Sequence, residues 1–247
     1  MTFGHGGKLL GSSPEGIVSI TATSGKSKWI STMPGNVDAA LPEAGAAVVA
    51  RNNWAVVRYE NGQLSAIAGA FPLAGSKLLA HPDGHICVLA SGGGRCTLTV
   101  LDDAVGSERQ LDIAFSPAVL GGAVLPGNRL YLAGMLRCGV LDIGENMVLN
   151  EDNWFNGPPV EANAVAVFSE NIVLTAGRSK DNGINTMLYA TDLVTHDHTK
   201  LLELESCRVT SLFKGKTGFY LLVDVFTASG QERAILMEAK VPTSALR

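Results

Sequence analysis

The fold class of this chain is indicated most clearly by the segment Val165-Ala166-Val167-Phe168-Ser169-Glu170-Asn171-Ile172-Val173-Leu174. Two short apolar runs rich in β-branched residues flank the polar stretch Ser169-Glu170-Asn171. Branched side chains pack well on a pleated surface, whereas serine and asparagine are typical of turns. The segment therefore predicts two antiparallel strands joined by a tight connection.

The same arrangement of apolar run, short polar turn and second apolar run occurs six times. The second runs begin at Ile17, Trp54, Ile86, Leu130, Ile172 and Phe219. A repeat of roughly 40 residues with several short strands is typical of a β-propeller, in which each four-stranded sheet, or blade, buries its faces against its neighbours. The sequence therefore predicts an all-β fold, a β-propeller of about six four-stranded blades, as a single domain over residues 1–247.

A β-sandwich or a longer barrel is the main structural alternative, because both also contain many short strands with regular turns. Six comparable units favour the propeller, whose ring is closed either by its own strand or by a strand of a partner. Helix is expected to be sparse. The central residues of the second runs should be buried, namely Val56, Val88, Leu132, Val173 and Leu221.

A third apolar run ends on an acidic residue in four of the units. These acids are Asp102, Asp142, Asp192 and Glu238. A carboxylate directly after a strand can accept hydrogen bonds from the amides of the following turn, so we expect these acids to be structural.

Over Leu188-Tyr189-Ala190-Thr191-Asp192-Leu193, and on through Ser206 to Val225, the chain resembles the WD40-like propeller repeat proteins. The whole chain fits the repeat period, but the Gly-His and Trp-Asp dipeptides of that family are absent at the matching places. The resemblance implies the propeller architecture and a mostly non-catalytic scaffold, and it transfers no site residue to this sequence.

Charge and composition argue against several classes of function. The chain has 19 basic and 23 acidic residues and no long run of like charge, so it lacks the concentrated basic surface that nucleic acid or an anionic membrane requires. No stretch approaches the roughly 20 apolar residues of a membrane span, and the N-terminus shows no secretory signal. We expect a cytoplasmic chain without a nucleic-acid partner or membrane insertion.

The four cysteines, Cys87, Cys96, Cys138 and Cys207, show no spacing typical of a metal site. Cys87 and Cys96 flank the turn 91–94 nearly symmetrically, so a hairpin could place them opposite one another and allow a disulfide. Two reduced, buried thiols are the favoured alternative in a cytosolic chain.

His196-Asp197-His198 is the densest group of potential metal ligands, because alternating residues of a strand would place both imidazoles on one face. No third nearby histidine or cysteine completes a zinc site, so a polar turn or surface strand is favoured. His81-Pro82-Asp83-Gly84-His85 is typical of a turn. Because no serine lies in a G-x-S-x-G motif, we expect no catalytic residue, no metal and no cofactor.

Two segments are candidates for partner binding. Trp154 and Phe155 lie among loop-forming residues between Asn150 and Pro159, in a chain whose aromatic content is 6%. Burial under a blade edge is one interpretation, and an exposed anchor for a partner is the other. Arg178 and Lys180 begin a charged insertion that either projects from the rim or forms a solvated hairpin tip.

These observations favour a non-catalytic protein–protein interaction scaffold, a WD40-like propeller acting as a subunit of a larger assembly. Two alternatives stay open: a six-bladed hydrolase or lactonase with an axial divalent metal, and a glycan-binding propeller. Axial ligands belong on or beside the innermost strands, whereas the aligned acids end third strands, which weakens the enzyme hypothesis.

Overall fold

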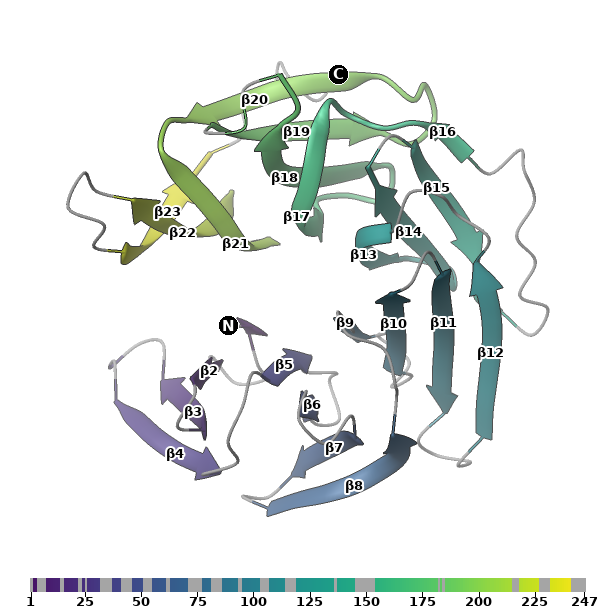
Figure 1. Cartoon of the computed structure of the whole chain (residues 1–247), viewed down its shortest axis with the longest axis vertical. Helices are drawn as coiled ribbons and strands as arrows, with labels where there is room; N and C mark the ends of the chain where they lie inside the picture. The colour runs from purple at the N-terminus through teal and green to yellow at the C-terminus, as the bar shows by residue number, and fades with distance from the viewer. Residues whose placement is uncertain are drawn as a thin grey trace. The chain divides into compact units, whose positions relative to one another are not determined.

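The computed structural model describes the strands of the chain and many of the turns between them (Figure 1). The described residues are 2–3, 8–13, 16–21, 24, 26–31, 37–40, 46–50, 55–60, 63–70, 77–80, 86–92, 95–102, 107–113, 119–135, 137–144, 154–181, 183, 185–214, 218–226 and 232–240. The chain divides into two compact units, Met1–Ser116 and Pro117–Arg247. Among the described residues, none belongs to a helix that is long and apolar enough to cross a membrane.

Unit 1 contains three four-stranded antiparallel sheets, which we name A, B and C. Sheet A comprises β1 (Thr2–Phe3), β2 (Lys8–Ser13), β3 (Gly16–Thr21) and β4 (Ser27–Ser31). Sheet B comprises β5 (Val37–Ala40), β6 (Ala46–Ala50), β7 (Ala55–Glu60) and β8 (Gln63–Ala70). Sheet C comprises β9 (Lys77–Ala80), β10 (Ile86–Gly92), β11 (Arg95–Asp102) and β12 (Ser107–Ile113).

Unit 2 contains sheets D, E and F. Sheet D comprises β13 (Val119–Leu125), β14 (Arg129–Gly134), β15 (Arg137–Asp142) and β16 (Trp154–Asn156). Sheet E comprises β17 (Val160–Val167), β18 (Ile172–Ser179), β19 (Thr186–Asp192) and β20 (His198–Leu204). Sheet F has three strands, β21 (Cys207–Lys214), β22 (Phe219–Phe226) and β23 (Glu232–Ala239). Within each sheet, every strand pairs antiparallel with the next in sequence, which confirms the prediction of an all-β fold; sheets A to E have the predicted four strands.

The repeated second run does not occupy the same place in every sheet. Ile17 lies in β3 and Trp54 immediately precedes β7, and these are the third strands of sheets A and B. In sheets C to F the corresponding run is the second strand. The interval from Trp54 to Ile86 is short because the first run belongs to the third strand of its sheet and the second run to the second strand of the next sheet. A strand–turn–strand pattern cannot reveal this difference.

In unit 2, sheet E packs against neighbours on both faces. Leu174 and Leu188 belong to one apolar cluster with Leu221 of sheet F. Val173 belongs to a second cluster with Tyr131 and residues of sheet D. The first strands β13, β17 and β21 lie side by side. Stacking of successive sheets thus buries both faces of sheet E, as inter-blade packing requires.

The predicted core residues are buried wherever the structure describes their side chains. Val88, Leu132, Val173 and Leu221 are completely buried. Val56 pairs within β7, but its side chain lies outside the described residues. Burial of the second runs is therefore confirmed in sheets C, D, E and F.

Two of the strand-ending acids anchor turns as predicted. Asp142 Oδ1 accepts a hydrogen bond from the amide of Gly144 at 2.7 Å. Asp192 Oδ1 accepts hydrogen bonds from the amides of Val194 at 2.7 Å and Thr195 at 3.1 Å. These carboxylates satisfy amides that the strands leave unpaired. Glu238 differs, because it lies within β23 opposite Tyr220, and its charge raises the pKa of that phenol.

The expectation that Cys87 and Cys96 could face one another is wrong. In the β10–β11 hairpin, Gly92 pairs with Arg95, so Cys96 lies opposite Ser91 and Cys87 lies opposite Val100. The two thiols are therefore separated along the strands by far more than a disulfide spans. Both side chains are buried and neither is in a disulfide, which confirms the alternative.

Candidate functional site

The candidate partner-binding segment around Trp154 and Phe155 is a strand and not the loop that its composition suggests. Trp154–Asn156 forms β16, the outermost strand of sheet D. It pairs antiparallel with β15, so that Trp154 lies opposite Gly139 and Phe155 opposite Cys138. Asparagine and proline near the segment indicate a loop locally, but the open edge of β15 provides a hydrogen-bonding template that overrides this preference.

The indole of Trp154 lies against the backbone of Gly139. A Cβ atom at Gly139 would overlap the six-membered ring of this indole. Glycine is therefore required at position 139 for the tryptophan to lie down on β15. The Trp154 side chain is half-buried, so it is a supported aromatic surface on the outer strand of the sheet.

Phe155 points to the other face of β16 and is part of the core. Its side chain is 8% exposed and belongs to the apolar cluster between sheets D and E. Its ring stacks on His196, with centroids 4.1 Å apart and planes within 3°, and lies 6.5 Å from the ring of Tyr131. For Phe155 the structure thus favours the first of the two interpretations, burial beneath the blade edge.

The turn that follows β19 carries the histidine that covers Phe155. His196 has a φ of 63°, in the left-handed region, and its amide donates to the carbonyl of Asp192 at 2.9 Å. The left-handed backbone breaks the alternation of side chains, so His196 and His198 are not neighbours on one face of a strand. The favoured interpretation of 196–198, a polar turn entering a surface strand, is confirmed.

His198 connects sheets D and E through both ring nitrogens. Nε2 lies 2.8 Å from the carbonyl oxygen of Asn156, and Nδ1 lies 3.0 Å from the hydroxyl of Thr191. A carbonyl can only accept, so Nε2 carries the proton and, in the neutral ring, Nδ1 accepts from Thr191. The imidazole is thereby held as a bridge between β16 and β19.

Beneath this bridge lies a buried polar group, the Tyr131 cluster, formed by Tyr131, Cys138, Thr175 and Thr191. The Tyr131 hydroxyl donates to Cys138 Sγ at 2.9 Å. The hydroxyls of Thr175 and Thr191 lower the pKa of the Tyr131 phenol and so lie near it. Thr175 Oγ1 is fully buried and has no partner in hydrogen-bonding geometry among the described residues.

Burial controls ionisation in this cluster. Burial first, and the neighbouring Cys138 second, hold the pKa of Tyr131 well above its ordinary value of 10.0. Burial also raises the pKa of Cys138, although the Tyr131 hydroxyl and the more distant charge of Lys180 act in the opposite direction. A buried thiol with a raised pKa is a poor nucleophile, so the cluster is better suited to joining two sheets than to covalent chemistry.

The cations predicted for partner binding differ in their relation to β16. The backbone amide of Lys180 donates to the carbonyl of Pro159 at 3.3 Å, in the connection from β16 to β17. Arg178 is an exposed residue of β18, opposite Glu161 and Thr186. A further cation that the sequence did not single out, Arg137, extends Nη2 to within 3.5 Å of the Trp154 carbonyl. Lys180 and Arg137 thus lie beside the aromatic strand, while Arg178 lies further along its hairpin.

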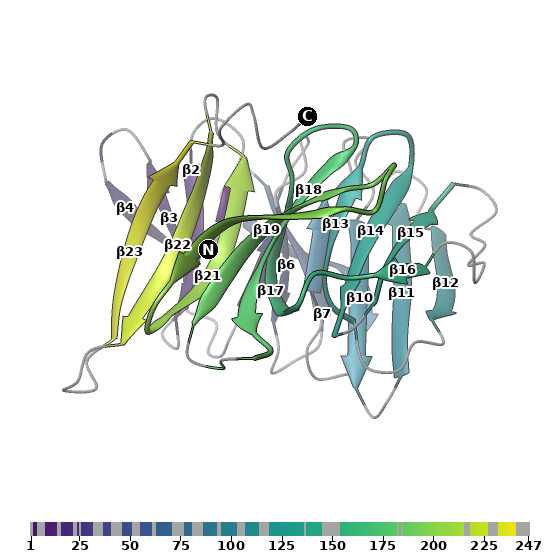
Figure 2. The same ribbon diagram turned by 90° about the horizontal axis from the view of Figure 1, so that it is seen from above.

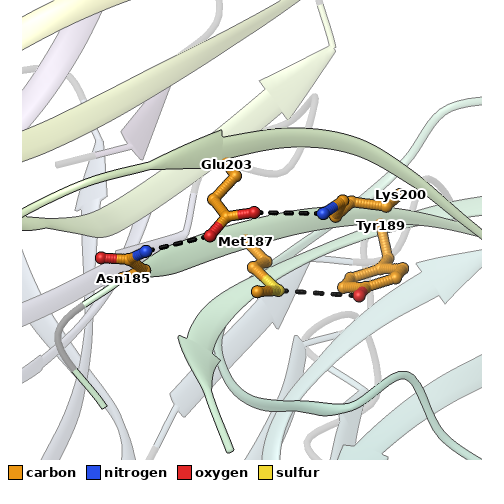
Figure 3. Close-up of polar contacts among 5 residues, drawn as sticks. All are labelled: Asn185, Met187, Tyr189, Lys200 and Glu203. Carbon is orange, nitrogen blue, oxygen red and sulfur yellow. Dashed lines mark hydrogen bonds and ion pairs between the residues drawn. The ribbon is translucent and has the colours of Figure 1, made fainter. Parts of the chain in front are cut away.

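Figure 3 shows a second polar group of unit 2, on the exposed surface of β19 and β20. Glu203 accepts a hydrogen bond from Asn185 Nδ2 at 2.9 Å and forms an ion pair with Lys200 at 3.1 Å. These contacts hold the pKa of Glu203 below its ordinary value, with Asn185 the larger cause. The Tyr189 hydroxyl lies 3.6 Å from the sulfur of Met187. The group is solvated and stabilises the strand pair locally.

The described part of the chain contains no cluster of three or more histidine, cysteine, aspartate or glutamate side chains arranged to hold a metal ion. The segment His81–His85 lies outside the described residues. Ser91 lies in β10 opposite the buried Cys96, and Ser19 and Ser65 are strand residues.

Comparison with known proteins relates this chain to others by fold. No family model matches the sequence, and no curated protein matches it. Among solved structures, virginiamycin B lyase from Staphylococcus aureus is similar, with a TM-score of 0.64 and 12% identity over 97% of this chain and 84% of the lyase. Oligogalacturonate lyase in complex with manganese has a TM-score of 0.58 and 12% identity over 92% of this chain and 73% of the lyase. YCF48 bound to D1 peptide has a TM-score of 0.58 and 14% identity over 92% of this chain and 72% of YCF48.

These similar structures are β-propellers, and together with the stacked antiparallel sheets they establish a propeller-like architecture. They include both enzymes and a peptide-bound protein, so the likeness concerns the fold alone. The WD40-like family is not singled out among propellers.

Proposed function

We propose that this chain is a non-catalytic protein-interaction scaffold, a cytoplasmic WD40-like propeller of six blades that forms one domain and serves as a subunit of a larger assembly. The half-buried Trp154 on the outermost strand of sheet D is the observation that carries this proposal. Aromatic side chains that are accessible but held in place are favoured anchors at protein interfaces.

The support beneath Trp154 makes it a pre-organised anchor. Gly139 has no Cβ atom that would displace the indole, and the buried neighbour Phe155 fixes β16 to the core. Holding the indole in place before binding reduces the conformational entropy lost on association. Trp154 is therefore better placed to bind a partner than Phe155, which the interior already uses.

The charge around the strand indicates the chemistry of the partner. Arg137 and Lys180 lie beside β16 and its connection to β17, and Arg178 is exposed on the same hairpin as Lys180. Cations at the rim of an aromatic anchor steer acidic partners and select among them. The proposed partner is a protein segment that combines an apolar side chain for Trp154 with aspartate or glutamate for the cations.

The rival hypotheses, a propeller hydrolase or lactonase with an axial metal and a glycan-binding propeller, need a set of groups that converge on a ligand. In the described part of unit 2, His198 bridges two strands and Cys138 is buried with a raised pKa, so both are committed to structure. Trp29 and Trp154 lie on the outermost strands of sheets A and D, β4 and β16, but Trp154 lies opposite Gly139, whereas Trp29 lies opposite Val18. These features support the scaffold over its rivals.

Affinity purification followed by a binding measurement on the recovered partner tests the proposal. Trp154→Ala should weaken binding of the partner by about 30-fold, equivalent to about 2 kcal/mol, as expected of a hot spot. Trp29→Ala is the matched control, because Trp29 is 51% exposed on another outer strand. Gly139→Ala should also weaken binding, because the added methyl group displaces the indole of Trp154 without removing it.

The proposal fails if Trp154→Ala and Trp29→Ala bind the partner equally well while both proteins are folded. Turnover of an ester, lactone or glycoside would instead establish the enzyme, provided that substituting a convergent set of carboxylates abolishes it.

A further inference from the structure

Sheet F differs from every other sheet of the chain in having no fourth strand among the described residues. Sheets A to E each end in an outer strand, namely β4, β8, β12, β16 and β20. In sheet F, β22 lies between β21 and β23 (Figure 2). No described strand pairs with the outer edge of β23. The backbone amides and carbonyls along that edge are a template for one more strand.

The centre of β23, from Ala234 to Met237, is apolar, and the charged residues of the strand lie towards its ends. Ile235 is 44% exposed and Leu236 is 51% exposed, and as neighbours in a strand they point to opposite faces of the sheet. Phe226 of β22 is also exposed, but the guanidinium of Arg208 lies 5.8 Å from its ring centroid and covers it. Among the described residues of sheet F, the exposed apolar surface is therefore centred on β23.

We propose that β23 pairs antiparallel with β23 of a second copy of this chain, so that two three-stranded sheets join into one six-stranded sheet. A two-fold axis perpendicular to the sheet relates the copies, and Leu236 lies on the axis opposite Leu236 of the second copy. The proposal concerns a surface separate from Trp154, so it stands or falls independently of the proposed function.

The sequence of β23 is self-complementary in this register. Leu236 meets Leu236 on one face, and Ile235 meets Met237 of the second copy on the other. Arg233 then lies opposite Ala239, and Glu238 lies opposite Ala234, so these charged residues do not face a like charge. A register centred on Ile235 would pair Leu236 with Ala234 and leave less apolar contact. Apolar pairing on both faces and the absence of opposed like charges favour the second copy as the occupant of this edge.

Two of the usual obstacles to edge pairing, proline and a β-bulge, are absent from β23. No proline interrupts residues 232–240, and β22 and β23 pair without a bulge from Phe219 opposite Ala239 to Phe226 opposite Glu232. Eight consecutive residues of β23 therefore follow a regular ladder, which leaves its outer edge regular as well.

Sedimentation of the full chain over a range of concentrations is the first test. We expect a monomer–dimer equilibrium, and Leu236→Lys should raise the dimer dissociation constant by at least about tenfold, because it places two ammonium groups opposite one another. Val194→Lys is the matched control: Val194 is 70% exposed in a turn of sheet E, away from β23, and its substitution should leave the dissociation constant unchanged.

Crosslinking tests the register. Opposed residues of antiparallel strands have Cα atoms about 4.5–5.5 Å apart, so Leu236→Cys should form a disulfide between copies under mild oxidation. Ala234→Cys should not, because the two substituted positions would lie about 13 Å apart along the strands. Both variants are made with Cys207→Ser, since Cys207 is the only half-buried native thiol and the other three are buried.

A chain that stays monomeric at all concentrations overturns the proposal, as does a dimer that Leu236→Lys leaves intact. Equal crosslinking of Leu236→Cys and Ala234→Cys excludes the proposed register. A variant that lacks residues 241–247 tests the other possible occupant of this edge, the C-terminal segment of the same chain. If only this variant dimerises, the edge is normally covered within one chain and the proposal is wrong.

Discussion

Trp154 and Phe155 lie on opposite faces of one short strand, and we assign Trp154 to partner binding and Phe155 to stability. Phe155 packs between Tyr131 and His196, whereas Trp154 lies over Gly139 at the surface. Because successive side chains of a strand point to opposite faces, adjacent aromatic residues take opposite roles. The same principle separates the two residues experimentally.

We predict that Phe155→Ala lowers the free energy of unfolding by about 3–5 kcal/mol, because it leaves a cavity at the boundary of sheets D and E. Trp154→Ala should cost less than half of that value, since its side chain is only half-buried. Urea denaturation followed by circular dichroism measures both. Equal losses for the two variants would show that Trp154 is also a core residue and would argue against it as the partner anchor.

Buried thiols and phenols predict the response to alkaline pH. Burial raises the pKa of Cys96 to about 11 and holds that of Tyr131 well above 10.0. Both groups are neutral below their pKa, and the unfolded chain loses these protons first. Their contribution to stability is therefore complete below about pH 9 and is lost as the pH rises towards 11.

We expect the midpoint of urea denaturation to fall between pH 9 and pH 11, with a smaller fall in Cys96→Ala. A midpoint that stays constant over this range would contradict burial of these groups.

In the native protein at neutral pH, Cys207 should react first with a thiol reagent, because it alone of the four cysteines is half-buried. Cys207→Ser is the control and should remove the fast phase.

At the scale of elements, the boundary between sheets D and E is held by polar groups as well as by apolar packing. His198 bridges β16 and β19, and the Tyr131 cluster lies beneath it. Within this boundary two buried threonines differ in one respect. The hydroxyl of Thr191 bonds to His198, whereas that of Thr175 has no partner in hydrogen-bonding geometry among the described residues.

We therefore predict that substituting each threonine by valine has different effects on the free energy of unfolding. Thr191→Val should lower the free energy of unfolding by about 1–2 kcal/mol, because it removes a hydrogen bond and leaves Nδ1 of His198 unsatisfied. Thr175→Val should be neutral or stabilising by up to about 1 kcal/mol, since it removes a buried hydroxyl that gains little from folding. Chemical denaturation of the two variants is the measurement. A large loss for Thr175→Val would indicate an ordered water bonded to its hydroxyl.

At the scale of the whole molecule, two compact units each consist of three antiparallel sheets, and the similar solved structures are propellers. Such a fold gains its stability from stacking of successive sheets, as sheet E shows between sheets D and F. The acids that end third strands in sheets D and E are engaged by turn amides.

We predict that excess EDTA leaves the melting temperature of the full chain unchanged. Asp142 and Asp192 serve turns, and His198 serves a bridge between strands, so these groups contribute to folding without an ion. Differential scanning calorimetry with and without chelator, followed by addition of Mn²⁺, is the measurement. A fall of several degrees that Mn²⁺ restores would support the propeller enzyme instead.

Local chemistry was enough to predict the repeated strand pairs, two of the turns that follow third strands, and the burial of the second runs. Val88, Leu132, Val173 and Leu221 are buried, and Asp142 and Asp192 bond to the turns that follow them. These features follow from runs of branched apolar residues and from carboxylates beside turn amides, which act over a few residues of the chain. These short-range patterns are therefore sufficient to predict that the chain is all-β and repetitive.

Which residues face one another follows from the folded structure and not from any local pattern. Cys96 lies opposite Ser91 because the turn of its hairpin is displaced from the midpoint between the cysteines, and a displacement of one residue changes every pair. Trp154 lies over Gly139 through the pairing of β16 with β15, and His198 reaches Asn156 across the boundary between sheets D and E. No local pattern encodes either contact. The edge of β23, which no described strand covers, likewise becomes apparent only once the strands of every sheet are assigned. Register and stacking depend on the simultaneous burial of distant segments, so they are properties of the folded chain and not of any one stretch of it.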